Sequence, residues 1–298
     1  MIRQFLLLIR LPNLFTVPTN ILVGYFAIIG STYTNALELL LLILSSLMMY
    51  ISGIVFNDYF DFETDLRERP NRPLPSRKVT KKEALIIALI SLISANILAL
   101  VVSSASLIIS LILSFVVISY DFKLKNTILG PLTMGSARFL NIILGASPAL
   151  FVIATSHNLL LRIISVSLFL FVYIIAISLL SKKEVVVESL QKTSKTVIVS
   201  LSIVFAIILS IVFTYFLGIF KIDLFVNLIL FAGIMVAIFR QINFDDSLTI
   251  QNGVKYMVIS IIVLDSIFLS GTIGLKYGLL SLILIVPSIL LARKLYVT

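Results

Sequence analysis

Residues 36–65 read ALELLLLILSSLMMYISGIVFNDYFDFETD, an apolar run that ends in a cluster of acidic side chains. The apolar part, roughly residues 36–57, is long enough to cross about 30 Å of hydrocarbon as a helix. A helix satisfies all of its backbone hydrogen bonds internally, which a segment in lipid must do. The stretch therefore predicts a transmembrane helix whose acidic end emerges at one surface of the bilayer.

Similar runs recur along the whole chain. Of its 298 residues 60% are apolar and 12% are charged, and the mean hydropathy is +1.16, which is far too apolar for a water-soluble domain. We expect one domain over residues 1–298, an all-α polytopic transmembrane helix bundle of nine or ten helices. The predicted spans are 12–31, 36–57, 83–103, 105–120, 131–154, 159–181, 196–218, 222–240, 254–274 and 277–295.

Lysine and arginine predict the orientation of these spans. All but four of the 23 fall on one side of the predicted topology. Basic loops stay in the cytoplasm, so both termini and the acidic motifs are expected there, in a multi-pass protein of the cell membrane. The first run shows no cleavage site and is expected to remain as a helix. The four exceptions are Arg138, Arg162, Lys221 and Lys276.

Composition also excludes several classes of function. The net charge of +9 follows from these basic loops, which attract membrane lipids, so we expect no nucleic-acid partner. The absence of cysteine excludes disulfides, thiolate metal sites and cysteine nucleophiles. The only histidine, His157, lies in a short external loop and is expected to be an interfacial residue and not a ligand.

Four oxygen-bearing side chains end the second span. On a regular helix, Asn57, Asp58, Asp61 and Asp65 fall within an arc of roughly 100°. Acidic groups at a helix C-terminus oppose the helix dipole and repel one another. A divalent cation removes both penalties, and Mg²⁺ accepts carboxylates while keeping positions for phosphate oxygens. The alternative is an acidic helix end that is simply solvated.

Basic groups follow on the same predicted side. Arg72 lies in a proline-rich loop, and its planar guanidinium suits phosphate oxygens. Tyr120 and Lys125 add a phenol and an amine after the fourth span. Taken alone, these groups equally fit ordinary cytoplasmic loops.

Polar residues inside other spans are expensive and usually face a cavity or a partner. Arg138 and Asn141 share one helix face near the start of the fifth span, although Arg138 could also reach the cytoplasmic surface. Glu184 and Glu188 share a face at the end of the sixth span and fit either a second metal site or a salt-bridged helix end. Asp265 lies deep in the ninth span, with no partner evident in the sequence.

Together these residues resemble the UbiA superfamily of membrane prenyltransferases. The similarity runs over roughly residues 8–195, and the stretch from Gly130 to Gly145 looks most like the EboC-like subgroup, which Ser181–Glu188 and Asp265 also fit. The motifs that carry the resemblance are Arg10-x-Pro12-Asn13, Asn57-Asp58-x-x-Asp61-x-x-x-Asp65, Arg72-Pro73-Leu74-Pro75-Ser76, and Tyr120 with Lys125.

The resemblance implies a helix bundle around a central cavity, in which Mg²⁺ ions bridge a prenyl diphosphate to two acidic motifs. The prenyl group would pass to a lipophilic acceptor within the membrane. By this resemblance the catalytic residues are Asp58, Asp61, Asp65, Tyr120 and Lys125. Those that bind substrate are Asn13, Asn57, Arg72, Arg138 and Asn141. Those that bind metal are Asp58, Asp61, Asp65, Glu184 and Glu188.

The second acidic motif departs from the family pattern. Glu184-x-x-x-Glu188 stands where typical members carry two aspartates, and lysines precede it. Glutamate keeps the charge but has one more rotatable bond to order. The departure leaves a second hypothesis open, that of a non-catalytic carrier or scaffold that binds or exports a hydrophobic metabolite.

Overall fold

The computed structural model describes residues 2–30, 34–150, 155–181, 190–243 and 246–295. These residues form helices joined by short connections, with no strand among them, so the predicted all-α class is confirmed. The α-helices are α1 (Ile2–Leu8), α2 (Leu11–Leu14), α3 (Thr16–Ile29), α4 (Ala36–Phe60), α5 (Phe62–Glu68), α6 (Lys81–Val102), α7 (Ser104–Phe122), α8 (Gly130–Ala146), α10 (His157–Ser181), α11 (Leu190–Phe216), α12 (Leu224–Gln241), α13 (Ser247–Ile259), α14 (Ile261–Ile273), α15 (Leu275–Ser281) and α16 (Ile285–Leu295). Three 3-10 segments are η1 (Leu124–Asn126), η2 (Ser147–Ala149) and η3 (Leu282–Leu284).

The chain is a multi-pass membrane protein. Within the described residues, 9 helical stretches are long and apolar enough to cross a bilayer. They are Leu11–Ile28, Ala36–Phe60, Lys81–Val102, Ser104–Phe122, His157–Ser181, Lys195–Phe216, Leu224–Gln241, Ser247–Ile273 and Leu275–Lys294. Helix α8 adds a shorter candidate of 17 residues, which η2 extends to Ala149. With α8 included, each of the ten predicted spans has a helical counterpart in the described part of the chain.

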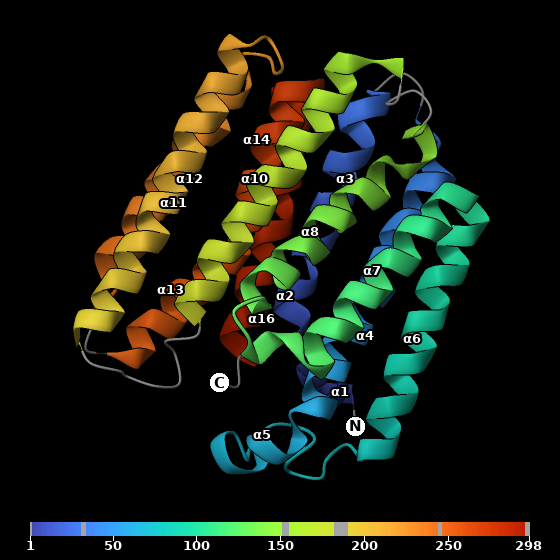
Figure 1. The fold of residues 1–298 in the computed structure, drawn as a ribbon, viewed down its shortest axis with the longest axis vertical. Coiled ribbons are helices and arrows are strands. Elements are labelled where there is room, and N and C mark those ends of the chain that lie inside the picture. Colours follow the sequence, from blue (N-terminus) through green and yellow to red (C-terminus); the bar gives the residue numbers. More distant parts are fainter. Residues whose placement is uncertain (1, 31–33, 151–154, 182–189, 244–245, 296–298) are drawn as a thin grey trace.

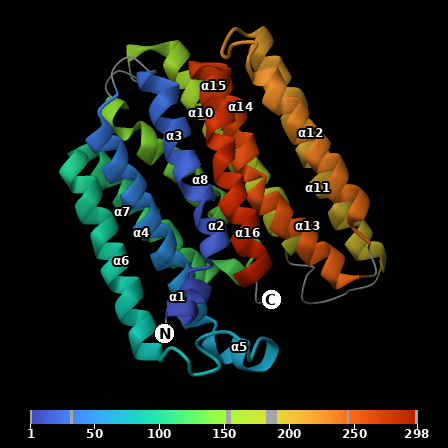
Figure 2. The ribbon, with the colours of Figure 1, turned by 180° about the vertical axis from the view of Figure 1, so that it is seen from behind.

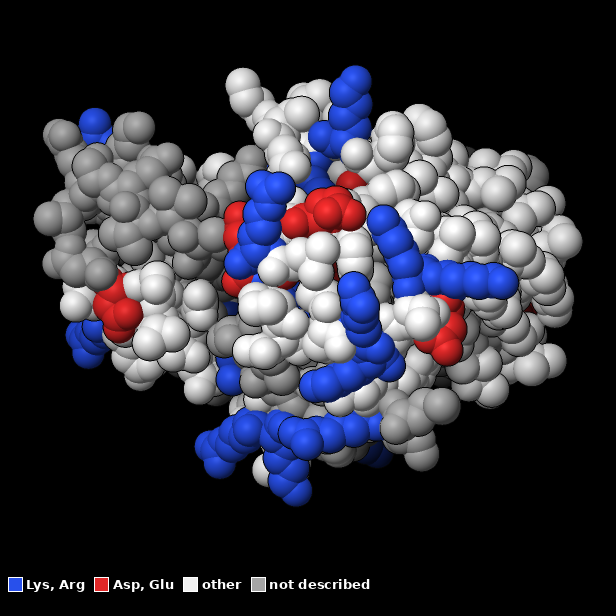
Figure 3. Space-filling model, turned by 90° about the horizontal axis from the view of Figure 1, so that it is seen from below, with Lys and Arg blue, Asp and Glu red and all other residues white. Residues whose placement is uncertain are grey.

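The direction of the helices agrees with an even number of crossings. Helix α1, helix α5 and the last turn of α16 all lie at the same end of the bundle (Figures 1 and 2). We call this the charged end, because Lys, Arg, Asp and Glu side chains gather on it (Figure 3).

Local sequence signals set several helix boundaries. The Asn35 side chain accepts hydrogen bonds from the backbone at the start of α4. Thr80 and Glu83 form a capping box at the start of α6, and Ser103 caps α7. Each cap satisfies backbone N–H groups that have no partner inside the helix.

Two glycines allow a close helix contact in the centre of the bundle. An added Cβ at Gly24 of α3 would lie 2.0 Å from the Ile142 carbonyl oxygen of α8. An added Cβ at Gly145 of α8 would lie 2.5 Å from the Ile21 carbonyl oxygen of α3. The backbones of α3 and α8 therefore touch, which is how small residues pack helices in membranes.

Helix α14 lies at the centre of the C-terminal half. Every residue from Ile261 to Gly271 is buried, and α14 packs against α3, α12 and α15. Helices α6 and α7 flank the centre on one side, and α11 and α12 flank it on the other (Figure 1). The last helix also reaches the first elements, since Ser288 Oγ of α16 donates to the Pro12 carbonyl oxygen of α2 at 2.8 Å.

Candidate active site

The acidic motif lies at the charged end, where α4 gives way to α5. Asp58 and Asp65 are buried, whereas 25% of the Asp61 side chain is exposed. Helix α4 ends at Phe60 and α5 begins at Phe62, so Asp61 stands at the break between them. Helix α5 turns off the line of α4 at this break (Figure 1), so Asp65 does not continue the regular helix that the spacing argument assumed.

Arg72 brings two of the carboxylates together. Its Nη1 lies 2.7 Å from Asp65 Oδ2 and 3.5 Å from Asp58 Oδ1. Burial raises the pKa of the Asp65 carboxyl, and the charge of Arg72 acts in the opposite direction. Burial also lowers the pKa of Arg72, as does the nearby positive charge of Arg10. The proline-rich loop thus folds back on the acidic motif.

Arg10 completes this group from the N-terminal side. Its Nη2 donates to Asp58 Oδ1 at 2.9 Å. Its backbone adopts the left-handed conformation, with φ 47°, between α1 and α2. Asn13 follows on α2, where its carbonyl oxygen accepts a hydrogen bond from the Thr16 hydroxyl.

Lys125 binds the remaining acidic residue. It lies in η1, directly after α7, and its ammonium donates to Asp61 and, at 3.5 Å, to Asn57 Oδ1. Tyr120 is half-buried near the end of α7, and it lies within the electrostatic reach of Asp61 and Arg10. The segment that carries Tyr120 and Lys125 therefore approaches the acidic motif.

Two charged residues near the acidic motif were not predicted as site residues from the sequence. Asp121 is buried and interacts electrostatically with Lys125, Asp61, Arg10 and Asp58. In the sequence Arg10 is distinguished only by the N-terminal signature, although it is an ion-pair partner of Asp58. No spacing rule links either residue to the motif, because both contacts depend on how separate helices pack.

The ion pairs at this end all join a basic side chain to the acidic motif. The four pairs found among the described residues are Arg10–Asp58, Arg72–Asp58, Arg72–Asp65 and Lys125–Asp61. The same part of the chain contains no group of three or more acidic or histidine side chains that could hold a metal ion. In this arrangement each of the three aspartates of the motif is paired with a basic side chain.

A second polar group lies deeper in the bundle, around Arg138 of α8. Its Nη1 donates to Asn20 Oδ1 at 2.8 Å, and its Nη2 donates to Thr16 Oγ1 at 3.2 Å. The amide of Asn141 donates to the same Asn20 oxygen at 3.4 Å and accepts from the Ser46 hydroxyl. We call Arg138, Asn141 and their partners Thr16, Asn20, Ser46, Thr19 and Asp265 the inner network.

Helix α4 links the two polar groups. The Arg138 guanidinium lies over the ring of Tyr50, 5.9 Å from its centroid. Tyr50, Asn57 and Asp61 fall on one face of a regular helix. The rise between Tyr50 and Asn57 is about 10 Å. The inner network therefore lies roughly two helical turns deeper than the acidic motif, along the same side of α4.

Two predicted residues cannot be placed. Glu184 and Glu188 lie outside the residues that the structure describes. The proposed second acidic motif therefore stays a prediction.

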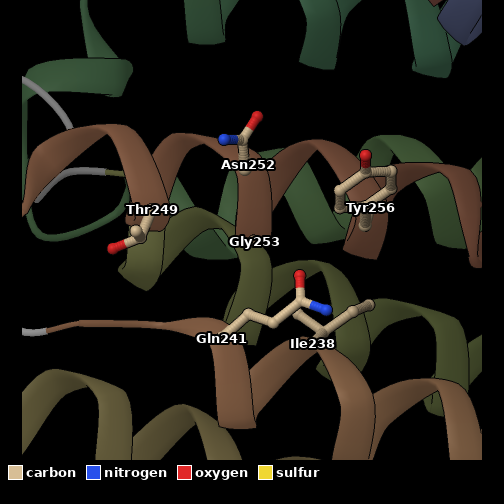
Figure 4. Close-up of a pocket in the computed structure, with 6 residues that line it drawn as sticks. All are labelled: Ile238, Gln241, Thr249, Asn252, Gly253 and Tyr256. Carbon is tan, nitrogen blue, oxygen red and sulfur yellow. The ribbon is translucent and has the colours of Figure 1, made fainter.

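One pocket lies away from these residues. It is formed by α12 and α13 and includes Gln241, Asn252 and Tyr256, none of which is charged (Figure 4). The predicted site residues do not line it, so it is separate from the acidic motif.

The sequence matches one protein family over most of its length. A sequence model of the UbiA prenyltransferase family matches residues 17–260. The digeranylgeranylglyceryl phosphate synthase of Methanosphaera stadtmanae is 36% identical over 116 residues, which is 36% of this chain and 41% of that protein. The aligned region thus spans less than half of this curated relative.

Solved structures share the fold. A UbiA homolog from Aeropyrum pernix K1 superposes with a TM-score of 0.71 at 13% identity, covering 86% of this chain and 96% of that one. A UbiA homolog from Archaeoglobus fulgidus, bound to GPP and Mg²⁺, superposes with a TM-score of 0.62 at 12% identity, covering 89% and 99%. At these identities the likeness concerns the arrangement of the helices.

Proposed function

The chain belongs to the UbiA prenyltransferase family, and from that membership and its charged end we propose that it transfers a polyprenyl group from a prenyl diphosphate to a lipophilic acceptor within the membrane. The observation that carries the proposal is that Arg10, Arg72 and Lys125 form ion pairs with the acidic motif. Cations and carboxylates at the mouth of a membrane bundle suit a metal-bound diphosphate whose hydrocarbon chain extends inward.

The residues present fit Mg²⁺. Asp58 and Asp65 already share one cationic nitrogen of Arg72, and Asp61 and Asn57 share that of Lys125. Mg²⁺ commonly takes one or two carboxylates and fills its other positions with water and substrate phosphate. We propose Asp58, Asp61 and Asp65 as its ligands. When bound, Mg²⁺ would supply positive charge that stabilises the diphosphate leaving group.

The second acidic motif is proposed as a further metal site. Glu184 and Glu188 carry the same charge as the aspartates of the family pattern and share a helix face in the sequence. This part of the proposal rests on the sequence alone.

The basic side chains would bind and orient the diphosphate. When the allylic C–O bond breaks, its electron pair stays on the diphosphate oxygen, and Arg72 and Lys125 would stabilise that developing negative charge. Tyr120 would donate a hydrogen bond to a diphosphate oxygen, with Asn13 and Asn57 assisting. The acceptor then forms a bond to the allylic carbon and loses a proton.

Deeper residues would complete the site. Arg138 and Asn141 are proposed to contribute to substrate binding from the inner network. The surrounding apolar helices would exclude water from the allylic cation, which water would otherwise consume.

We propose that the charged end faces the cytoplasm. Basic residues favour the cytoplasmic side of a membrane protein. Exposed ones at this end of the described chain include Arg67, Arg77, Lys78, Lys81, Lys82 and Lys123. Both chain ends would then also be cytoplasmic.

The test measures Mg²⁺-dependent release of diphosphate by the purified protein. Geranylgeranyl and farnesyl diphosphate are the donors, and the acceptor panel includes a prenylated glyceryl phosphate, the class of lipid named for the relatives. We expect turnover that Asp61→Ala abolishes. Glu63→Ala is the matched control, because Glu63 is exposed and lies two residues away. No release by the intact protein with any acceptor would refute the proposal.

A second candidate function is a non-catalytic carrier of a hydrophobic metabolite. It rests on the glutamates that replace the second aspartate pair of the family pattern. This candidate predicts transport of a prenylated lipid into vesicles that persists in Asp61→Ala, without release of diphosphate.

A further inference from the structure

Asp265 is the one member of the inner network with a charge opposite to that of Arg138. It lies on α14 and is 0% exposed. Its Oδ2 accepts hydrogen bonds from the Thr19 hydroxyl and, at 2.6 Å, from Asn20 Nδ2. Its Oδ1 is buried without a hydrogen-bond partner in the described part of the chain. Burying a carboxylate at this depth of the membrane costs free energy, so a partner that stabilises its charge is expected.

Asn20 joins Asp265 to Arg138. Its amide nitrogen donates to Asp265, and its amide oxygen accepts from Arg138 Nη1 at 2.8 Å. An asparagine amide can present either its oxygen or its nitrogen in a given direction. Because the carboxylate accepts only, it binds the nitrogen and turns the oxygen towards the guanidinium. Arg138 and Asp265 also attract each other electrostatically across Asn20.

The chain of contacts continues to the face of α4 that carries the acidic motif. Arg138 is held at one side by Asn20 and Thr16 and lies over the ring of Tyr50. Neither Asn20 nor Thr16 is charged, but Asp265 of α14, which lies behind Asn20, acts electrostatically on the guanidinium.

We propose that Asp265 is a positioning residue, which acts through the amide of Asn20 to hold the Arg138 guanidinium charged and directed towards the site on α4. The inference rests on the proposed function, in which Arg138 contributes to substrate binding. A residue that the reaction depends on would then lie on α14, in the C-terminal half of the chain and far in the sequence from both acidic motifs.

Exchanging the two side chains gives the sharpest test. Asp265→Asn alone removes the charge but keeps the size and one acceptor oxygen. We expect it to lower kcat/KM for geranylgeranyl diphosphate about tenfold or more, as loss of a charged interaction does. In Asn20→Asp/Asp265→Asn the charge moves to position 20, where the introduced carboxylate would accept from Arg138 and from the new amide at position 265. We expect this exchange to restore kcat/KM to within about threefold of the original.

A cycle with Arg138→Gln separates positioning from general packing. If Asp265 acts through Arg138, adding Asp265→Asn to Arg138→Gln lowers kcat/KM no further. Ser266→Ala is the matched control on α14, because Ser266 is equally buried and its hydroxyl donates to the Val263 carbonyl oxygen of its own helix. The proposal would be overturned if the two substitutions lowered kcat/KM independently, so that their fold losses multiplied in the double variant. It would also be overturned if Asn20→Asp/Asp265→Asn had a kcat/KM no higher than that of Asp265→Asn.

Thermal unfolding in detergent gives a readout that is independent of turnover. Asp265→Asn and Arg138→Gln should each lower Tm by several degrees. The double variant should lower Tm by less than the sum of the two single decreases. Additive losses in Tm would also overturn the proposal. If no variant and no intact protein releases diphosphate, the proposed function fails, while the Tm cycle still decides whether Asp265 and Arg138 are coupled.

Discussion

The guanidinium of Arg72 donates to the carboxylate of Asp65 over 2.7 Å, and 14% and 3% of these two side chains are exposed. The pair closes the proline-rich loop over the end of α4. Removing either charge would leave the other buried, which usually destabilises a protein strongly.

Arg72→Leu should therefore lower the free energy of unfolding by roughly 3 kcal/mol in EDTA. Added Mg²⁺ should recover more stability in this variant than in the original chain, because the ion replaces the lost positive charge beside Asp58 and Asp65. The measurement is Tm in detergent with EDTA or MgCl₂. Lys78→Leu is the control, since Lys78 is exposed in the same loop. An identical Mg²⁺ response in all three proteins would contradict a metal site there.

Lys125→Met should lower kcat for the release of diphosphate by about a hundredfold, the usual cost of removing one donor to a developing negative charge. Lys123→Met should have little effect, because Lys123 is exposed just before η1. Steady-state kinetics with saturating donor compare the two. Equal decreases in kcat would mean that Lys123 and Lys125 act only through their total charge.

Gly24→Ala and Gly145→Ala should each destabilise the protein by about 1–3 kcal/mol through overpacking. Either methyl group would push α3 and α8 apart, because backbone atoms lie within 2.5 Å of each position. Gly233→Ala has nothing within 4 Å of the added atom, so it should be neutral or slightly stabilising. Tm values of the three variants test this, and a tolerated Gly24→Ala would show that the two helices lie further apart.

Arg10→Gly should be more stable than Arg10→Ala by about 1 kcal/mol. Both remove the ion pair with Asp58, but only glycine adopts the left-handed conformation at φ 47° without strain. Comparing the Tm of the two variants isolates the backbone effect. A more stable alanine variant would show that the backbone here is not left-handed.

The sequence was sufficient to predict most of the fold. Long apolar runs identified the spans, because lipid leaves the backbone few alternatives to a helix. The fifth span was expected over residues 131–154, whereas α8 ends at Ala146 and is followed by a 3-10 turn that contains Pro148.

The contacts of the site were less predictable. Regular spacing could not show that α4 breaks at Asp61, which redirects Asp65. The pairing of Asn20 with Asp265 joins residues 245 positions apart, and only the packing of α3 on α14 brings them together. Polar residues inside apolar spans indicated that partners exist, but the pattern does not identify the partner.

The hydrogen bond from Ser288 to the Pro12 carbonyl has a consequence for biosynthesis. Helix α2 follows Arg10 and carries Asn13, yet it packs against α16, which is synthesised after all the other described helices. Earlier helices can enter the bilayer one by one, but the part of the site that α2 carries stays uncovered until α16 has been synthesised. Chains that stall before residue 285 should therefore be targets of membrane proteases.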